Sequence, residues 1–522
     1  MKDGTFSAAD VRQLHDQGIS VEEGQRQIER LARPPRYLDV QRPCTVGDGI
    51  VRLAAPELDD LCEHHAAAAH AGRFVKFVPA SGAATRMFAG LGQFHEGPGR
   101  GTDWTTVVAR ADAGDARAAE LVTFLAELPR FAFHARLELL LRSRGLDLGA
   151  LAAAGSYAPI LDGLLGPQGL DYARKAKGLI EFHRYAAGSR TALEEQLVES
   201  RDYVRDGRGV SRSHFTVARS HRAAFEAAAR TAAERLAADG TRLEVSWSTQ
   251  RRSTDTLTLD ATGRPLRDDA GRLVFRAGGH GALLEDLEEI GADLAFIKNI
   301  DNVQRERADS PESRWKRVLG GYIVRLQREV FRLLDELRGP QPAPGLVDEA
   351  RALVRERLQA DLGNGRPTAE AAAGTLVALL NRPLRVCGVV RYGGEPGGGP
   401  FWVRGADGRS TLQIVEASQV DPADGFRERL FASSTHFNPV DLVCAMRDHA
   451  GRPFALSRFV DPEAEIVTHK TEFGRELRVL ERPGLWNGAM ALWNTVFVEV
   501  PIETFAPVKT VRDLLRNEHQ PT

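Results

Sequence analysis

The sequence predicts an α/β fold built on a parallel sheet, with its functional site at the carboxyl ends of the strands. Two stretches carry this prediction. In the first, an apolar run that begins at Phe74 passes directly into the small residues at 80–84. In the second, a glycine turn is followed by a helix at 282–290 and an apolar strand at 294–302. Strand, turn, helix and strand in this order are typical of a βαβ unit.

The bulk composition indicates a globular protein. Its 522 residues are 27% charged and 43% hydrophobic, with a formal net charge of -2. This balance gives no electrostatic attraction to nucleic acid or to an anionic membrane, so we expect neither as a partner. No apolar stretch is long enough to span a bilayer, and residues 1–10 lack the core of a signal peptide. The scattered cysteines indicate buried thiols in a cytoplasmic protein.

The remaining elements follow from periodicity and turn signals, taken in chain order. Helices are expected at 7–32 and 58–71, in an Ala- and Leu-rich helical insertion at about 105–165, and at 222–238, 312–337, 346–362 and 369–380. Strands are expected at 74–78, 214–217, 243–247, 384–390, 412–416 and 495–500, and a final helix within 505–515. The Pro-rich segment 340–344 is the best linker candidate.

These elements suggest three consecutive parts. Residues 1–72 form an N-terminal helical cap, and residues 73–339 form the first part of a core that carries the insertion. Residues 340–522 continue the core and add a C-terminal part.

The small-residue loop after the first strand is the leading candidate for binding an anion. Ser81, Gly82, Ala83 and Ala84 allow several backbone N–H groups to converge on a phosphate, because no large side chain obstructs the approach. Arg86 adds a positive charge beside the loop. The alternative is an ordinary turn with Arg86 on a helix surface.

Three further motifs combine glycine, charge or a strand end. They are Lys177-Gly178, the cluster Gly278-Gly279-His280 and the pair Asp301-Asn302. An acid at the end of a strand in a parallel sheet is a typical ligand position. Each motif also has a structural alternative, namely a solvated lysine, a tight turn or a helix cap.

In this order the motifs resemble those of the UDP-sugar pyrophosphorylases, which include the UDP-glucose and UDP-N-acetylglucosamine enzymes. That family has a glycine-rich loop with T-R-[ML], a P-K-G segment, a P-G-G-[HN]-G motif and D-N after a strand. V-E-A-S-Q at 415–419 is similar to its V-E-Y-S-E, and A-P-V-K-T-V-R-D-L-L at 506–515 to its P-V-K-T…D-L-L ending. Overall the chain also looks like the bacterial family called domain of unknown function 4301.

The resemblance implies a doubly wound, GT-A-like mixed sheet with the helical insertion and a small C-terminal α+β part. It also implies nucleotidyl transfer with Mg²⁺. The implied catalytic residues are Arg86, Lys177 and Lys509, and Asp301 is the implied metal ligand. The nucleotide is placed at the loop residues Ser81, Gly82, Ala83 and Ala84 and at Gln250, Gly278, Gly279 and His280; the substrate is placed at Asn302, Glu416 and His221.

We therefore predict a Mg²⁺-dependent nucleotidyltransferase that joins a nucleoside triphosphate, with UTP expected, to a sugar 1-phosphate or a similar phosphate. The prediction requires Arg86, Lys177, Asp301 and Lys509 to lie around one cleft. Two departures from the family pattern bear on triphosphate binding. Alanines replace glycines in the loop, and Ala176 replaces the proline before the lysine. The alternatives are a transferase that uses a ready-made nucleotide-sugar and a non-catalytic nucleotide-sugar-binding protein.

Overall fold

The computed structural model describes residues 6–307, 309–339, 343–362, 369–394, 397–472 and 475–521. The chain divides into two compact units, each assembled from separate segments. Unit 1 contains Met1–Phe77, Gln250–Ile297 and Trp315–Ile502, and unit 2 contains Val78–Thr249, Lys298–Arg314 and Glu503–Thr522. The two units are interleaved along the chain, whereas the parts predicted from the sequence are consecutive.

Unit 1 holds most of the strands. Its helices are α1 (Ala8–Gln17), α2 (Val21–Ala32), α3 (Ala55–His70), α12 (Leu284–Glu289), α13 (Pro311–Leu337, from Trp315 onward), α14 (Leu346–Glu356), α15 (Ala369–Leu380) and α16 (Gly425–Ala432). Its strands are β1 (Asp39–Pro43), β2 (Thr45–Val46), β3 (Gly49–Val51), β4 (Phe74–Pro79), β9 (Thr256–Asp260), β10 (Phe275–Arg276), β11 (Leu294–Lys298), β12 (Leu384–Arg391), β13 (Gly399–Arg404), β14 (Ser410–Val415), β15 (His436–Phe437), β16 (Asp441–Ala445), β17 (Ile466–Glu472), β18 (Arg475–Glu481) and β19 (Asn494–Glu499).

The main sheet of unit 1 is mixed. Its strands run in the order β2-β3-β19-β12-β16-β11-β4. Strands β11 and β4 pair in parallel, with Leu294 opposite Phe74 and Ile297 opposite Phe77. Strand β12 is parallel to β19 and antiparallel to β16. All residues of β11 are buried, as expected for a strand covered on both faces. The chain passes from unit 1 to unit 2 at the carboxyl ends of β4 and β11.

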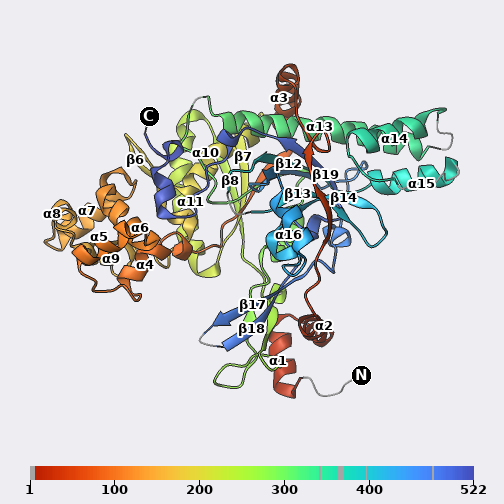
Figure 1. Ribbon diagram of the computed structural model, residues 1–522. Helices are drawn as coiled ribbons and strands as arrows, with labels where there is room; N and C mark the ends of the chain where they lie inside the picture. The colour runs from red at the N-terminus through yellow and green to blue at the C-terminus, as the bar shows by residue number, and fades with distance from the viewer. Residues whose placement is uncertain are drawn as a thin grey trace. The chain divides into compact units, whose positions relative to one another are not determined.

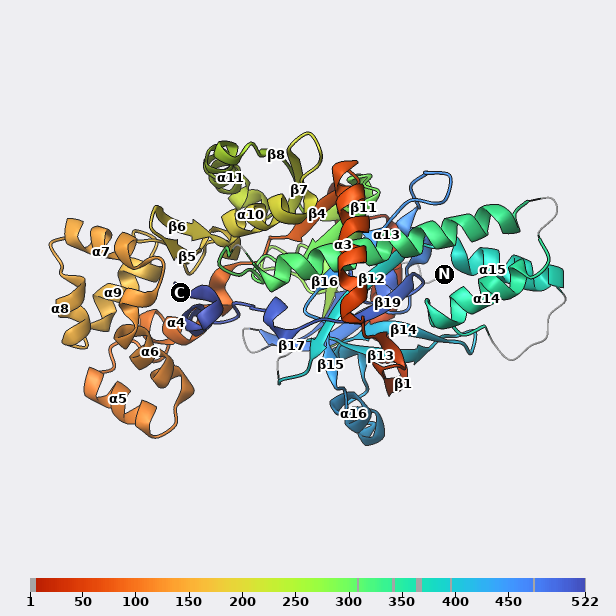
Figure 2. The same cartoon turned by 90° about the horizontal axis from the view of Figure 1, so that it is seen from above.

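Smaller sheets and helices complete unit 1. Strands β1, β13 and β14 form one antiparallel sheet, and β10, β9, β18 and β17 form another, in which the β17–β18 hairpin stands out in Figure 1. Helix α2 packs on β9 and β18. Helix α13 is a long amphipathic helix of 27 residues, and α14 packs against α15 beyond its end (Figure 2). No described helix is long and apolar enough to cross a membrane.

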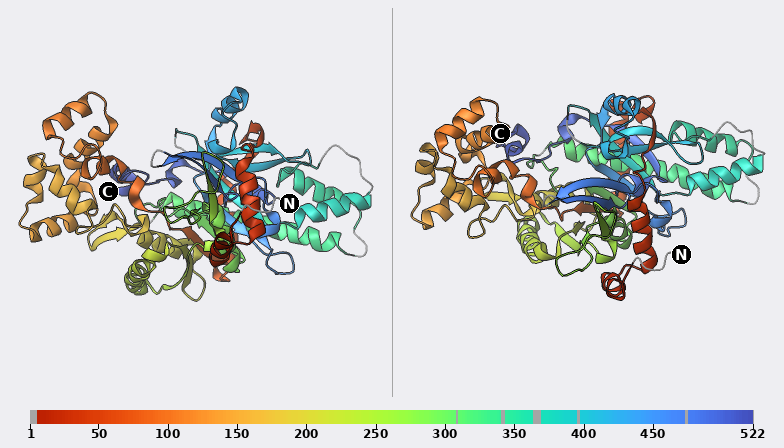
Figure 3. Two further views of the ribbon diagram at one scale, coloured as in Figure 1. Left: turned by 90° about the horizontal axis from the view of Figure 1, so that it is seen from below. Right: turned by 60° about the horizontal axis from the view of Figure 1, so that its bottom comes forward.

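Unit 2 combines a helical group with a small parallel strand pair. Its helices are α4 (Ala89–His95), α5 (Trp104–Asp112), α6 (Ala116–Ala126), α7 (His134–Ser143), α8 (Leu148–Ala153), α9 (Tyr157–Leu165), α10 (Ala192–Val204) and α11 (Arg222–Leu236). Its strands are β5 (Glu181–Tyr185), β6 (Gly188–Thr191), β7 (Val210–Thr216) and β8 (Arg242–Ser248). Helices α5 to α9, drawn in orange in Figure 3, correspond to the predicted insertion at 105–165.

One apolar core holds unit 2 together, and the C-terminal segment is part of it. Strands β7 and β8 pair in parallel, with α10 packed on β7 and α11 on β8. The core joins Phe88 and Phe131 of the helical group to Val508, Val511 and Leu514, which are all buried. Burial of these side chains fixes the path of residues 505–515, because each contributes roughly 1.5–3 kcal/mol of hydrophobic stabilisation.

Most of the predicted elements are confirmed, with local differences. The predicted helix 7–32 is two helices, because Gly18 adopts φ 78° and ends α1. The short strands β2 and β3 were not among the predicted strands. The predicted final helix is the 3-10 helix η12 (Val511–Leu515). In the predicted linker, residues 340–342 lie outside the described residues. The four cysteines are free, and Cys44, Cys387 and Cys444 are buried.

Candidate active site

Two lysines from distant parts of unit 2 converge on one carboxylate. Asp301 follows β11, Lys177 begins the 3-10 helix η3 (Lys177–Leu179), and Lys509 precedes η12. Nζ of Lys177 donates a hydrogen bond to Oδ2 of Asp301 over 3.0 Å, and Nζ of Lys509 donates to the same oxygen over 3.2 Å. Lys177 also donates to the carbonyl oxygen of Val508 over 3.0 Å. Three of the four residues predicted to share a site are therefore in contact.

The electrostatics of this group favour an anionic ligand. The side chains of Asp301 and Lys177 are 9% and 12% exposed, whereas that of Lys509 is 48% exposed. Burial raises the pKa of Asp301, but the ammonium groups of Lys509 and Lys177 outweigh burial and hold this pKa below its ordinary value. Asp301 is therefore ionised at neutral pH. Two lysines against one carboxylate leave an excess of positive charge, which attracts an anion to the half-exposed Lys509.

Backbone contacts fix the position of the segment that carries Lys509. The N–H of Val508 donates to the carbonyl oxygen of Asp301 over 3.0 Å. The N–H of Ala506 donates to Oδ1 of Asn302 over 3.1 Å, and Asn302 pairs with Pro507 as an antiparallel bridge. The buried Asn302 side chain therefore orients the C-terminal segment. Its predicted contact with a substrate stays a prediction.

The small-residue loop lies against the segment that carries Lys177. The N–H of Ala84 donates to the carbonyl oxygen of Lys175, and the N–H of Lys177 donates to that of Gly82, each over 3.0 Å. Residues 81–83 are exposed. Within the described part of the chain, no hydrogen bond engages their own backbone N–H groups. Three consecutive backbone N–H groups beside Lys177 are thus without a partner among the described residues, which leaves them available to a phosphate.

Arg86 lies close in the chain to this loop, and no hydrogen bond or ion pair among the described residues joins it to Lys177, Asp301 or Lys509. It ends the 3-10 helix η1 (Ala84–Arg86), and its side chain is exposed. Among the described residues it forms no hydrogen bond or ion pair, so its guanidinium group is free for an anion. The next residue, Met87, accepts a hydrogen bond from the N–H of Val511 over 2.9 Å, which connects this turn to the C-terminal segment. A cleft shared by Arg86 and the lysines stays a prediction.

The glycine cluster belongs to unit 1, where the backbone explains it. Gly279 adopts φ 75° and ψ −169°, a conformation that favours glycine. A Cβ atom on Gly278 would lie 2.3 Å from the carbonyl oxygen of Thr254, and one on Gly281 would lie 2.1 Å from that of Pro483. Close backbone approach is therefore sufficient to require these glycines. Their contact with a nucleotide stays a prediction.

His280 and Glu416 lie close together within unit 1. Nδ1 of His280 accepts a hydrogen bond from the N–H of Leu485 over 2.9 Å, and its ring stacks on Trp486 with centroids 4.0 Å apart. Nε2 lies 3.9 Å from Oε1 of Glu416. Burial lowers the pKa of His280 to about 4 and raises the pKa of Glu416. His280 is therefore neutral at pH 7 and carries its proton on Nε2.

Two further predicted residues have only local contacts. In unit 1, Nε2 of Gln250 donates to Oδ1 of Asp255 over 3.5 Å. In unit 2, His221 ends the 3-10 helix η4 (Arg219–His221), and its Nδ1 is buried without a hydrogen-bond partner among the described residues. Their predicted roles at the base and at the substrate stay predictions.

A divalent cation fits this site only if the protein and a bound phosphate both coordinate it. The described residues contain no group of three or more His, Cys, Asp or Glu side chains arranged for a metal ion. In the described part of the chain, however, no donor contacts Oδ1 of Asp301, so this oxygen is available. Mg²⁺ is commonly bound by one or two carboxylates together with substrate phosphates, and Asp301 meets that requirement.

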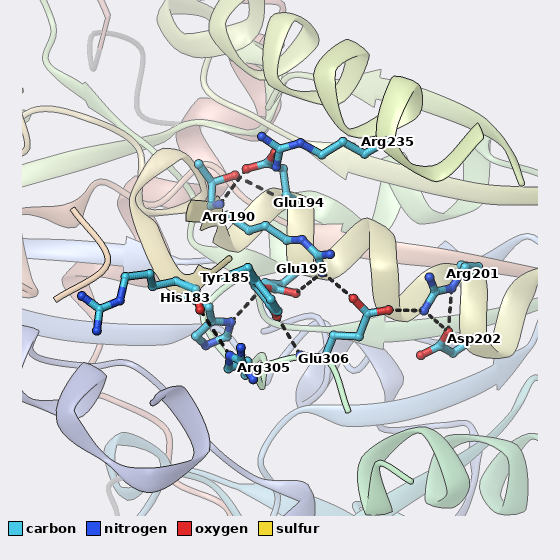
Figure 4. Close-up of polar contacts among 12 residues, drawn as sticks. His183, Tyr185, Arg190, Glu194, Glu195, Arg201, Asp202, Arg235, Arg305 and Glu306 are labelled. Atoms are coloured by element: carbon cyan, nitrogen blue, oxygen red, sulfur yellow. Dashed lines mark hydrogen bonds and ion pairs between the residues drawn. The ribbon is translucent and has the colours of Figure 1, made fainter. Parts of the chain in front are cut away.

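Sequence motifs did not reveal a second polar network in unit 2. Glu195 of α10 is its centre, and His183 and Tyr185 of β5 point toward it (Figure 4). The network continues to Glu306, in the segment that follows Asp301, and to His519 near the end of the described chain. These residues belong to no glycine motif, and their partners lie far away in the sequence, so no local signal distinguished them.

A comparison of the sequence with models of known protein families identifies the family of this chain. The model of the family described as "Domain of unknown function (DUF4301)" matches residues 7–520. The chain belongs to this family. No curated protein matches it.

Solved structures of UDP-sugar pyrophosphorylases align with most of this chain at low identity. A mutant UDP-glucose pyrophosphorylase of Leishmania major in complex with UDP-glucose is 14% identical, with a TM-score of 0.43, over 98% of this chain and 79% of that one. The UDP-N-acetylglucosamine pyrophosphorylase of Trypanosoma brucei in complex with an inhibitor is 13% identical, with a TM-score of 0.46, over 98% and 79%.

Proposed function

We propose that this protein is a nucleotidyltransferase that joins a nucleoside triphosphate, first of all UTP, to a sugar 1-phosphate or a similar phosphate and releases pyrophosphate. The observation that carries the proposal is the convergence of Lys177 and Lys509 on Oδ2 of Asp301. The exposed N–H groups of residues 81–83 beside Lys177 support it.

The reaction needs alignment and charge neutralisation more than covalent help from the protein. A phosphate oxygen of the acceptor attacks the α-phosphorus of the triphosphate, the new P–O bond forms, and the bond between the α-phosphorus and the bridging oxygen breaks. The electron pair leaves on pyrophosphate. Cationic groups placed around the phosphoryl oxygens lower the barrier, because negative charge moves between these oxygens during transfer.

The proposal gives each residue of the site one task. Lys177 and Lys509 contact the α-phosphate and the phosphate of the acceptor, where ammonium groups act as compact point charges. The N–H groups of residues 81–83 and the guanidinium group of Arg86 bind the leaving pyrophosphate. Asp301 orients both lysines before the substrates bind.

Asp301 is also the residue proposed to hold Mg²⁺, through its free Oδ1. A bound Mg²⁺ ion supplies charge neutralisation to the phosphate oxygens that it bridges. In unit 1, the proposal keeps Gln250, Gly278, Gly279 and His280 for the nucleotide and Glu416 for the sugar. Asn302 and His221 of unit 2 stay assigned to the substrate on the same basis, the sequence resemblance.

Pyrophosphate exchange tests the reaction directly. The protein is incubated with radiolabelled pyrophosphate, Mg²⁺ and each of a panel of nucleotide-sugars, among them UDP-glucose and UDP-N-acetylglucosamine. The reversed reaction transfers label into the nucleoside triphosphate, and we expect label in UTP. Removal of Mg²⁺ by EDTA is expected to abolish it. The variant K470M, on the β17–β18 hairpin, is a lysine control that is expected to retain full exchange.

The outcomes separate the proposal from its alternatives. Transfer or hydrolysis of the sugar without exchange would instead support a transferase that uses ready-made nucleotide-sugars. Binding of the nucleotide-sugar without any turnover would support a non-catalytic binding protein. Either outcome, in a preparation that folds normally, contradicts the proposal.

A further inference from the structure

The C-terminal segment that carries Lys509 ends in a buried chain of hydrogen bonds. Nδ1 of His519 lies 2.8 Å from Nε2 of His183, and Nδ1 of His183 lies 2.9 Å from Oε1 of Glu195. His183 is 0% exposed, and Glu195 and His519 are each 1% exposed. Three ionisable groups in a row are thus removed from water, which is costly unless they are paired with one another.

The carboxylate of Glu195 accepts hydrogen bonds at one end of this chain. Oε1 of Glu195 accepts from the hydroxyl group of Tyr185 over 2.8 Å and from Nδ1–H of His183. Nε2 of His183 and Nδ1 of His519 share the second hydrogen bond of this chain, with one nitrogen as donor and the other as acceptor. Nε2 of His519 is buried without a hydrogen-bond partner among the described residues.

The same network holds the segment that follows Asp301. The N–H of Glu306 donates to the Tyr185 hydroxyl group over 2.8 Å. The carboxylate of Glu306 accepts from Arg190 and from Arg201, each over 2.7 Å, and Arg190 lies 3.6 Å from Oε2 of Glu195 (Figure 4). The network therefore joins α10 and the β5–β6 hairpin to the two segments that supply Asp301 and Lys509.

Along the C-terminal segment, a bond to the site comes first and the bond to this network comes last. Val508 is bonded to Asp301, and Val511 to Met87. The backbone N–H of Lys509 donates to Oδ2 of Asp513 over 2.8 Å, which fixes the backbone of Lys509 relative to η12. Beyond η12, His519 is the only side chain of the described C-terminal residues 516–521 that bonds to the buried core of the network.

We propose that His519 is a positioning residue, which acts through His183 and Glu195 to keep residues 505–515 in place and thereby Lys509 against Asp301. The effect on catalysis rests on the proposed function, whereas the effect on the C-terminal segment does not. We call the hydrogen bond between His519 and His183 the anchor of this segment. Its loss lets residues 505–515 open locally, and Lys509 then leaves the carboxylate of Asp301 more often.

The charges around His519 make the anchor dependent on its neutral form. Glu195 of α10, His183 and Tyr185 of β5 and Arg190 of β6 face it directly or through His183. The segments at 305–306 and 516–518 add Arg305, Glu306, Arg516 and Glu518. Burial first, then the charges of His183 and Arg516, hold the pKa of His519 well below its ordinary value. Protonation of His519 in acid therefore opposes the anchored state.

Hydrogen exchange measured by mass spectrometry tests the anchor without any assay of activity. In the full chain, H519A is expected to speed exchange of the amides at 505–515 by about tenfold or more at about pH 7.5, while exchange in β7 and α10 stays as in the wild type. H519Q is expected to restore most of the protection, because its amide group can donate to Nε2 of His183. H214A is the matched control, since His214 is a buried histidine of unit 2 bonded to Ser246 and Ser248.

Acidification provides a second test that needs no variant. After correction for intrinsic rates, the wild-type amides at 505–515 are expected to lose protection between about pH 7.5 and about pH 5.5, and those of H519Q to change less. Unchanged exchange at 505–515 in H519A would overturn the proposal, as would equal acceleration throughout unit 2. If pyrophosphate exchange is absent but these changes occur, the proposed function fails and the anchor stands.

Discussion

Nζ of Lys177 and Oδ2 of Asp301 lie 3.0 Å apart, although 124 residues separate them along the chain. Lys509, 208 residues beyond Asp301, binds the same oxygen. The carboxylate thus holds two cations together that would otherwise repel each other. A phosphate that enters the site competes with Asp301 for both lysines, and this exchange of partners is the basis of the first predictions.

Substitution D301N is expected to abolish pyrophosphate exchange and to destabilise unit 2. An amide oxygen cannot neutralise Lys177, which is 12% exposed and would become an unpaired charge in a poorly hydrated position. Breaking a buried ion pair costs about 3 kcal/mol or more. Denaturant unfolding measures the loss, with K470M as the control. A stability equal to that of the wild type would show that solvent, not Asp301, neutralises Lys177.

Substitutions of the two lysines are expected to differ in their effect on the stability of the fold but not in their effect on activity. K509M should cost less than about 1 kcal/mol, because the Lys509 side chain is 48% exposed and its ion pair is screened by water. K177M should cost more, since Lys177 also bonds to the carbonyl oxygen of Val508. Each variant should lower exchange by about 100-fold or more, the usual effect of removing one group that stabilises a transition state. Undiminished exchange in K509M would remove Lys509 from the mechanism.

Acid should weaken the fold in a way that depends on Asp301. Its pKa is lowered in the folded protein, so the folded state binds fewer protons than the unfolded state. The stability that Asp301 contributes is fully present above its unfolded pKa of about 3.8 and is lost as the pH falls through the lower folded value. The free energies of unfolding of the wild type and of D301N, plotted against pH, should therefore converge in acid. Parallel curves down to the lowest pH that the protein tolerates would contradict this.

The sequence predicted the elements that carry local signals, and it could not predict how they combine. Apolar runs at Phe74 and Leu294 identified β4 and β11, and helical periodicity identified the insertion. The interleaving of the two units has no local signal in the sequence, because long-range contacts place Val508, Val511 and Leu514 in the core of unit 2. Gly18 shows a limit of predicting helices from periodicity, since a single left-handed residue divides one periodic pattern into two helices.

The sequence predicted those residues of the site that belong to a motif. Lys177, Asp301 and Lys509 each belong to a motif, and the structure brings them together. Gly278 and Gly279 were assigned to a ligand, whereas the approach of the Thr254 backbone to Gly278 and the positive φ of Gly279 suffice to explain them. His519 gave no signal, because its role depends on contacts with residues more than 300 positions away in sequence.

Alanine substitutions at the glycine cluster should separate the role of the backbone from that of a ligand. A Cβ on Gly281 would lie 2.1 Å from the carbonyl oxygen of Pro483, so G281A must displace backbone. We expect a loss of about 1–3 kcal/mol, measured by denaturant unfolding. Gly374 of α15 is the control, because a Cβ there meets nothing within 4 Å. G374A is expected to be neutral or to stabilise by up to about 1 kcal/mol. Wild-type stability in G281A would mean that a ligand, not the fold, requires this glycine.

His280 should stay neutral far below the pH at which an exposed histidine takes up a proton. Burial lowers its pKa to about 4, and Nδ1 already accepts a hydrogen bond from the N–H of Leu485. Protonation at Nδ1 would set two N–H groups against each other, so the neutral ring with its proton on Nε2 persists. The stability that this ring contributes is complete above its unfolded pKa of about 6.5 and falls as the pH is lowered toward 4. Nitrogen chemical shifts of the ring, recorded from about pH 7.5 to about pH 4.5 and assigned with H280Q, measure this directly. A midpoint near 6.5 would show that the ring is open to solvent and that Leu485 does not hold it.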